Sequence, residues 1–156
     1  MTRIIILLIC PILVFSKTFT AKVIRVVDGD SFNVLRISDK EELRLRLHGI
    51  DAPETKQPYG RESKDALKGL LGPKTEISVK VLDKDRYGRL ICELHLDNKD
   101  ISVNEWMVSE GNAWHYVKYA PNDINLKSAE ENARNNKLGL WSLETPIPPW
   151  DYRKMN

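Results

Sequence analysis

The most constraining part of this sequence is residues 43–54, which read Leu-Arg-Leu-Arg-Leu-His-Gly-Ile-Asp-Ala-Pro-Glu. Apolar and polar side chains alternate through the first six positions, which is the period of a strand with one buried and one polar face. Such a strand delivers Arg46 to a surface. Asp51 and Glu54 follow in a turn restricted by Pro53, because proline fixes its own φ and pushes the preceding residue towards extended conformations. The pattern predicts that an arginine and two acids lie close together.

Length and composition favour a single globular domain. The chain has 156 residues, of which 42% are hydrophobic and 29% are charged. A chain of this size can bury a core without metal or disulfide staples, and its composition is neither that of a disordered chain nor that of a multi-span membrane protein. The formal net charge of +2 does not by itself indicate whether the chain binds nucleic acid. A basic surface for nucleic acid would have to come from basic residues that cluster locally.

The amino terminus, residues 1–16, has the pattern of a secretory signal peptide. One basic residue precedes an almost unbroken apolar run over residues 4–15, and a small residue follows. The run is short for a membrane span, although a retained membrane anchor is the alternative. We predict cleavage at about residues 16–21. The mature domain, residues 17–156, is then secreted into the extracellular space or the periplasm.

Strand patterns dominate the first two thirds of the mature domain. Residues 19–37 read as two strands joined by the tight turn Asp28-Gly29-Asp30, and residues 43–48 form the third. Alternating apolar positions predict two further strands over residues 77–81 and 90–96. About five strands of this size indicate a small β-barrel, for which the OB-type barrel is the natural candidate.

Helical patterns interrupt and follow these strands. Apolar residues recur at helical spacing over residues 66–71, a capping-box pattern opens a second helix within residues 102–111, and a last helix is predicted from about 122 to 139. We interpret the proline-rich tail, residues 145–156, as a surface strap anchored by Trp150. A polyproline ligand for a partner is the alternative.

Two acidic turns form a candidate metal site. Asp28 and Asp30 alone suit an ordinary hairpin turn, and an EF-hand is excluded because Phe32 takes the next ligand position. A second acidic turn, with Asp51 and Glu54, ends an adjacent strand and can meet the first across the sheet edge. Several carboxylates without cysteine or histidine partners favour Ca²⁺ or Mg²⁺ over zinc.

Two arginines make this acidic site suitable for a phosphodiester. Arg46 lies beside one acidic turn, and Arg89 ends the charged connection between the last two strands. In phosphoryl transfer, negative charge builds on the non-bridging oxygens, where guanidinium forks and a divalent cation are most effective. Glu54 is the candidate to orient the attacking water.

Three spaced motifs of the chain resemble those of the staphylococcal nuclease (thermonuclease) family. They are Val27-Asp28-Gly29-Asp30-Ser31, then Arg46 followed five residues later by Asp51-Ala52-Pro53-Glu54, then Asp85-Arg86-Tyr87-Gly88-Arg89. The resemblance implies an α+β, mainly β fold, a five-stranded OB-fold barrel with three appended α-helices. It also implies a Ca²⁺-dependent nuclease that cleaves DNA and RNA and leaves 3′-phosphate ends.

The resemblance also implies roles for the acids. Asp30 and Asp51 would bind one Ca²⁺ through their carboxylates, and Ala52 would bind it through its backbone carbonyl. Glu54 would act as general base or would orient the water. Asp28 would support the metal site without necessarily touching the ion.

Five further residues would bind the substrate. Arg46 and Arg89 would clamp the scissile phosphate, while Arg86, Tyr87 and Tyr119 would contact the nucleotide, with a base stacked on Tyr119.

The chain departs from the family pattern at a few of these positions. Ser31 stands where threonine is common, and Arg86 replaces a lysine that meets a terminal phosphate. Val117 falls where another pocket tyrosine is expected, with Tyr116 one position earlier. The outer nucleotide pocket therefore differs from the family pattern, whereas the acids and arginines match it.

Two hypotheses of different classes follow. The first is a secreted, monomeric, Ca²⁺-activated nuclease without an obligate protein partner, which prefers flexible or single strands because a stiff duplex cannot thread a cleft. The second is a non-catalytic OB-type module that binds nucleic acid or protein, like degenerate nuclease-like domains in Tudor-containing scaffold proteins. Such modules lose the acids and arginines, and this chain retains all of them: Asp30, Arg46, Asp51, Glu54 and Arg89.

Overall fold

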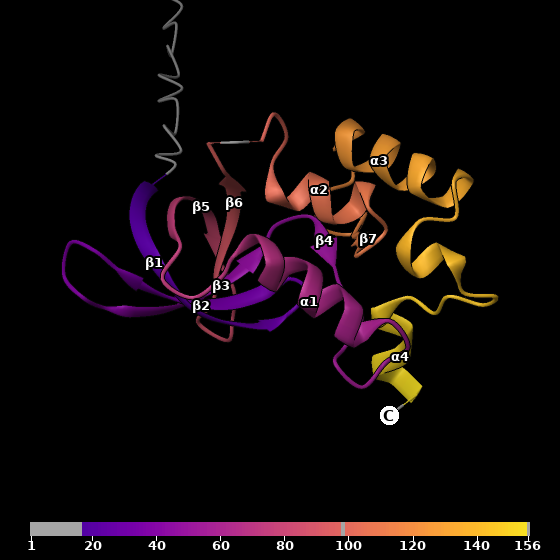
Figure 1. Ribbon diagram of the computed structural model, residues 1–156, viewed down its shortest axis with the longest axis horizontal. Coiled ribbons are helices and arrows are strands. Elements are labelled where there is room, and N and C mark those ends of the chain that lie inside the picture. Colours follow the sequence, from indigo (N-terminus) through magenta and orange to yellow (C-terminus); the bar gives the residue numbers. More distant parts are fainter. Residues whose placement is uncertain (1–16, 98, 156) are drawn as a thin grey trace, which may run out of the picture.

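Five strands close into a barrel in the order β1-β2-β3-β6-β5, which confirms the predicted OB-type architecture (Figure 1). The computed structural model describes residues 17–97 and 99–155, so the predicted signal peptide lies outside the described residues. Neighbouring strands are antiparallel except β3 and β6, whose parallel pairing closes the barrel. The strands are β1 (Lys17–Asp28), β2 (Ser31–Arg36), β3 (Glu42–Leu47), β5 (Glu76–Lys84) and β6 (Leu90–His95).

The alternation in the sequence places one face of each strand inside the barrel. In β3, Leu45 and Leu47 are buried while Arg46 between them stays partly exposed. Cys92 is also buried in the barrel core, and its loss of solvation raises the pKa of the thiol to about 12. The thiol is therefore unreactive near neutral pH. The barrel core consists of Ala21, Val23, Phe32, Val34, Leu45, Leu47, Ile77, Val79, Cys92 and Leu94.

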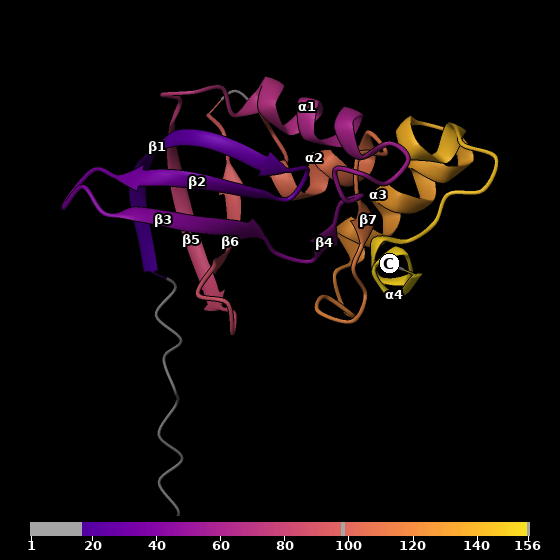
Figure 2. The same cartoon turned by 90° about the horizontal axis from the view of Figure 1, so that it is seen from below.

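The helices and a small ribbon gather beside and beyond one end of the barrel (Figures 1 and 2). Within residues 17–97 and 99–155, no helix is long and apolar enough to cross a bilayer. Two short strands, β4 (Ile50–Asp51) and β7 (Trp114–His115), pair as a separate ribbon between the barrel and the later helices. The helices are α1 (Gly60–Leu70), α2 (Val103–Ser109), α3 (Ile124–Asn135), the 3₁₀ helix η1 (Gly139–Ser142) and α4 (Pro149–Met155).

Helix α3 ends earlier than the sequence indicated. It stops at Asn135, whereas apolar spacing predicted a helix up to Gly139. Lys137 adopts a left-handed φ of 53°, and the N–H of Leu138 donates to the backbone oxygen of Ala133 at 2.9 Å. This closing turn satisfies a free helical carbonyl and turns the chain away before the glycine.

The C-terminal tail contains a helix that was not predicted from the sequence. The described part of the chain therefore has four α-helices beside the barrel, where three were expected. Pro149 takes the first position of α4, where its missing N–H costs nothing. The Trp150 ring stacks on Tyr116 with centroids 5.0 Å apart and lies edge-on to Trp114 at 5.6 Å. The interpretation of the tail as a strap anchored by Trp150 is thus confirmed.

Gly29 allows α1 to approach the first acidic turn. A Cβ atom at Gly29 would lie 1.9 Å from Oγ of Ser63 and 2.8 Å from Cβ of Ala52. Ser63 is fully buried, and its Oγ donates to the backbone oxygen of Asn112 at 2.6 Å, so it has little freedom to move aside. Because Gly29 has no side chain, the first acidic turn can lie in direct contact with α1 and with the second acidic turn.

Gly29→Ala is therefore expected to lower the free energy of unfolding by about 2 kcal/mol or more, since overpacking a buried contact forces backbone shifts. Gly69→Ala is the matched control, because a Cβ at this exposed position of α1 meets nothing within 4 Å. Helix propensity should make the control more stable by about 0.5–1 kcal/mol. Urea unfolding measures both variants, and equal stabilities would contradict this packing role.

Candidate active site

Asp30 connects the two acidic turns. Its Oδ2 accepts a hydrogen bond from the backbone N–H of Ala52 at 2.9 Å, and its Oδ1 accepts from Oγ of Ser31 at 2.6 Å and from Nη1 of Arg46 at 2.8 Å. Sheet register explains the last contact, because Ser31 pairs with Arg46 across β2 and β3. Asp30 is only 3% exposed, so protein donors rather than water compensate its charge.

Asp51 is fully buried in β4, opposite Trp114 of β7. Its Oδ1 accepts from Nη2 of Arg46 at 2.8 Å, so one guanidinium bridges Asp30 and Asp51. Burial lowers the pKa of Arg46, but the charges of the two acids outweigh this effect and leave the pKa raised above its ordinary value. Arg46 is therefore a permanent cation between two buried carboxylates.

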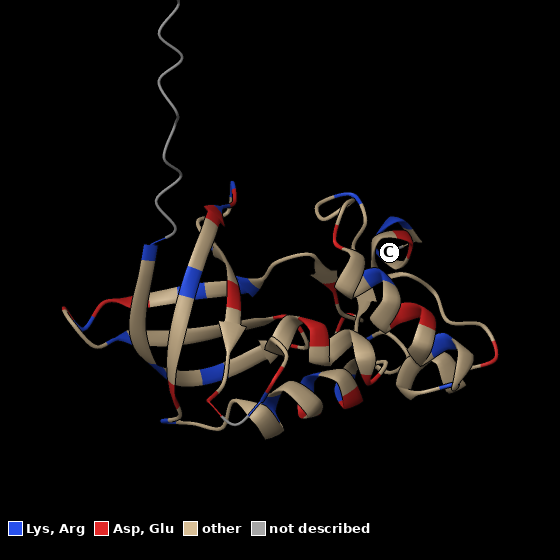
Figure 3. Cartoon of the chain, turned by 90° about the horizontal axis from the view of Figure 1, so that it is seen from above, with Lys and Arg blue, Asp and Glu red and all other residues tan. Residues whose placement is uncertain are grey.

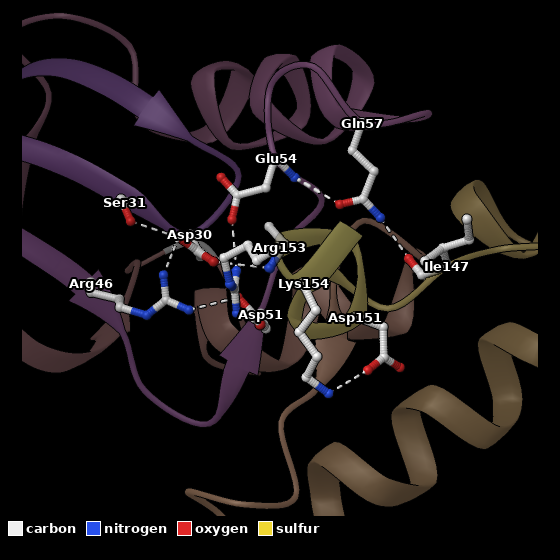
Figure 4. A network of polar contacts seen from close by, with 11 residues as sticks. Asp30, Ser31, Arg46, Asp51, Glu54, Gln57, Ile147, Asp151, Arg153 and Lys154 are labelled. Atoms are coloured by element: carbon white, nitrogen blue, oxygen red, sulfur yellow. Dashed lines mark hydrogen bonds and ion pairs between the residues drawn. The ribbon is translucent and has the colours of Figure 1, made fainter. Parts of the chain in front are cut away.

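A second arginine, Arg153 of α4, reaches the same acids (Figure 4). Its Nη2 donates to Oδ2 of Asp51 at 2.6 Å, and its Nη1 donates to Oε1 of Glu54 at 2.6 Å and to Oδ1 of Asp51 at 3.3 Å. Partial burial lowers the pKa of Arg153, but its hydrogen bonds to Asp51 and Glu54 outweigh burial and raise the pKa above the ordinary value. Asp51 is thus paired with two permanent cations.

The donor set suits a hard divalent cation. Asp30, Asp51 and Glu54 offer carboxylate oxygens, the ligands that Ca²⁺ prefers. Their three negative charges face two guanidinium groups, which leaves one net negative charge, or two when Arg153 is elsewhere. Within residues 17–97 and 99–155, no three acids, histidines or cysteines are arranged around an ion position. By charge and ligand type, the three acids fit a divalent cation.

Asp30 and Glu54 line a cleft of about 860 Å³, and Asp51 is buried behind it. Asp28 also lines it and accepts a hydrogen bond from Oγ1 of Thr55 at 2.6 Å, which ties the first acidic turn to the loop after Glu54. Figure 3 shows acidic and basic segments interspersed over the barrel and helices in that view. The residues predicted to bind substrate all line the cleft: Arg46, Arg86, Tyr87, Arg89 and Tyr119.

Arg89 is oriented by its own hairpin rather than by the acids of the two turns. Its Nε donates to Oδ2 of Asp85 at 2.7 Å, and its backbone N–H donates to Oδ1 at 2.9 Å. Burial raises the pKa of Asp85, but the hydrogen bonds from Arg89 outweigh burial and lower it overall. Asp85 therefore stays ionised near neutral pH and holds Arg89 at the edge of the cleft.

Exposed aromatic rings complete the cleft. Tyr87 is 58% exposed and Tyr119 is 61% exposed. The guanidinium of Arg86 lies 4.9 Å from the ring centroid of Tyr87 and donates to its hydroxyl at 2.7 Å, and Tyr116 packs edge-on against Tyr119 at 4.9 Å. Exposed rings beside cationic side chains are typical of surfaces on which single-stranded bases stack.

Comparison with known proteins identifies the family of the chain. Residues 44–143 match the family described as staphylococcal nuclease homologue. The chain belongs to the staphylococcal nuclease family. An uncharacterized endonuclease of Escherichia coli O157:H7 is 41% identical over 132 residues, which cover 85% of this chain and 83% of that protein.

Other relatives carry nuclease names as well. A micrococcal nuclease of Shigella flexneri is 34% identical over 144 residues, which cover 87% of this chain and 81% of that protein. A staphylococcal-like nuclease of Arabidopsis thaliana is 38% identical over 138 residues, which cover 88% of this chain and 40% of that protein. The chain is therefore a nuclease with nucleic acid as its substrate, which confirms the family resemblance of the three motifs.

The sequence analysis missed the residues that the C-terminal tail adds to this nuclease. Pro149 after another proline was a usable signal for the start of a short helix. No local pattern indicates that Arg153 reaches Asp51, because the two residues are 102 positions apart in the chain. Gln57 was missed for the same reason, since its side chain donates to the backbone oxygen of Ile147, 90 positions away.

Arg46→Ala is expected to lower the free energy of unfolding of the nuclease by about 3–5 kcal/mol in the absence of divalent cations, because it leaves the buried charges of Asp30 and Asp51 without their shared partner. Lys80→Ala is the control, since it removes an exposed cross-strand pair with Glu93 that contributes at most about 1 kcal/mol. Chemical denaturation of the two variants provides the measurement. Similar losses would mean that the Arg46 bridge is not the main electrostatic support of the site.

Proposed function

We propose that this nuclease is a secreted, Ca²⁺-dependent endonuclease that hydrolyses DNA and RNA, prefers flexible or single strands and leaves 3′-phosphate ends. The observation that carries the proposal is the buried bridge of Asp30, Arg46 and Asp51 at a cleft that also holds Arg89. Paired carboxylates beside converging guanidiniums are the groups that a phosphodiester transition state needs.

The ion would be held by the carboxylates of Asp30 and Asp51 and by the backbone carbonyl of Ala52. Once bound, a divalent cation supplies Lewis acidity and draws negative charge away from the phosphate. Asp28 supports this site indirectly, because its hydrogen bond to Thr55 fixes the first acidic turn against the loop that carries Glu54.

The side chains at the site activate the water and bind the phosphate. Glu54 accepts a proton from a water molecule, and the water oxygen attacks phosphorus. Arg46 and Arg89 bind the non-bridging oxygens, where negative charge increases in the transition state. The bond from phosphorus to the 5′-oxygen of the next nucleotide breaks, this oxygen takes up a proton from solvent, and the phosphate stays on the 3′-oxygen.

The preference for flexible strands follows from the shape and lining of the cleft. A single strand can bend into the cleft and stack bases on Tyr87 and Tyr119, whereas a duplex keeps its bases paired and its backbone stiff. Arg86 adds a cation beside Tyr87 and suits a neighbouring phosphate.

Export and assembly are part of the proposal. The amino-terminal segment, residues 1–16, directs secretion to the extracellular space or periplasm, with cleavage at about residues 16–21, and the enzyme acts as a monomer. Mass spectrometry of the exported protein tests this part. A mature terminus in that interval supports secretion, and an intact terminus in the membrane fraction contradicts it.

Digestion of denatured DNA, RNA and duplex DNA by the purified full-length protein tests the activity. We expect cleavage with Ca²⁺, none after chelation, faster loss of the single strands than of duplex, and products with 3′-phosphates that a 3′-phosphatase removes. Products with 5′-phosphates would contradict the proposed bond cleavage. A folded protein that cleaves nothing with Ca²⁺ or Mg²⁺ would favour the binding-module alternative.

Arg89→Ala should reduce kcat by about 10²–10³-fold, the range observed when one transition-state donor is removed. The fold should survive, because Arg89 pairs with Asp85 in a partly exposed connection. Arg61→Ala, which removes an exposed arginine of α1, is the matched control. Steady-state kinetics on denatured DNA with saturating Ca²⁺ compare the two variants, and near-normal turnover of Arg89→Ala would remove Arg89 from the phosphate clamp.

A further inference from the structure

The contacts of Arg153 use the carboxylate oxygens that the proposed ion requires. Oδ1 of Asp51 accepts from Arg46, and its Oδ2 accepts from Arg153. Oε1 of Glu54 accepts from the same Arg153 guanidinium. Oδ2 of Asp51 must give up its contact with Arg153 before it can bind a metal ion, and a divalent cation at Asp51 would repel the nearby Arg153 guanidinium.

The start of α4 is tied to the loop that carries Glu54. The side-chain amide of Gln57 donates to the backbone oxygen of Ile147 at 2.6 Å, and its Oε1 accepts from the backbone N–H of Glu54 at 3.1 Å (Figure 4). The hydroxyl of Tyr152 donates to the backbone oxygen of Lys56 at 3.3 Å. These contacts place the helix so that Arg153 faces the acids.

We propose that Arg153 is a latch that competes with the catalytic divalent cation. The guanidinium and the ion occupy Asp51 alternately, and the guanidinium in place also holds Glu54. Helix α4 therefore sets the cation concentration at which the nuclease becomes active. This inference rests on the proposed function, because it takes Asp51 to be an ion ligand. Without the ion, Arg153 stabilises the buried charge of Asp51, and ion binding releases the side chain.

Release needs only a local movement. The side chain of Arg153 is 41% exposed although it pairs with a fully buried acid, so solvent already reaches it. Pro149 is buried and Trp150 packs on aromatic rings, whereas Arg153 lies in the last turn of the helix. The anchor of the tail can therefore stay docked while the guanidinium leaves the acids.

Calorimetric titration of Ca²⁺ into full-length protein, without nucleic acid, tests the latch directly. Arg153→Ala should bind Ca²⁺ about tenfold more tightly than the natural chain or better, because a competing cation beside Asp51 is gone. Arg153→Lys should fall between them, since an ammonium keeps the charge but lacks the fork that spans two acids. Lys154→Ala is the control, because Lys154 forms a surface ion pair with Asp151 of the same helix. The Ca²⁺ affinity of this variant should stay within about twofold of that of the natural chain.

The change in melting temperature on addition of Ca²⁺ distinguishes the latch from a purely structural role of Arg153. Without Ca²⁺, Arg153→Ala should melt at a lower temperature than Lys154→Ala, because Asp51 loses a partner. Saturating Ca²⁺ should raise the melting temperature of Arg153→Ala by more than that of the natural chain, since no ion pair has to be broken first.

The outcomes separate the latch from the proposed function. Equal or weaker Ca²⁺ binding by Arg153→Ala, relative to the natural chain, would overturn the latch and leave the Ca²⁺ site standing. Absence of Ca²⁺ binding in the natural chain and in all three variants would overturn the proposed Ca²⁺ site and the latch together. Tighter binding by Arg153→Ala alongside an unchanged Lys154→Ala supports both.

Discussion

The Arg46 bridge is the interaction on which the rest of the site depends. Two buried carboxylates, Asp30 and Asp51, come from different turns and would repel each other without a cation between them. The β2–β3 register places Arg46 beside Asp30. The short segment after β3 then returns the chain so that Asp51 also reaches Arg46. A guanidinium in this position also faces the cleft, so the group that stabilises the fold is available to a phosphate.

The C-terminal tail makes the site depend on a segment far from it in the sequence. Trp150 packs on Trp114, the residue of β7 that pairs with Asp51 of β4. Gln57 joins the tail to the loop that carries Glu54. The same docking places Arg153 on Asp51. The tail therefore contributes both structure and charge to the active site. Both are needed if Arg153 is to compete with the ion that Asp51 is proposed to bind.

Sequence predicted the parts of this protein that local patterns specify. The strand ending near Gly49, the acidic turns and the capping box at α2, where Ser102 accepts from the N–H of Glu105 at 3.0 Å, all depend on neighbours in the chain. The end of α3 depends on a left-handed residue that apolar spacing does not reveal. Arg153 depends on tertiary packing over 102 residues, so one sequence carries no signal for it.

A crystal structure of the nuclease grown with Ca²⁺ tests the central claim most directly, with the ion located by its anomalous scattering. We expect an ion bound by Asp30 and Asp51, with Arg46 beside it and Arg153 withdrawn from Asp51. An ion bound elsewhere would contradict the proposed Ca²⁺ site, and an Asp51 that remains paired with Arg153 in crystals grown with saturating Ca²⁺ would contradict the latch.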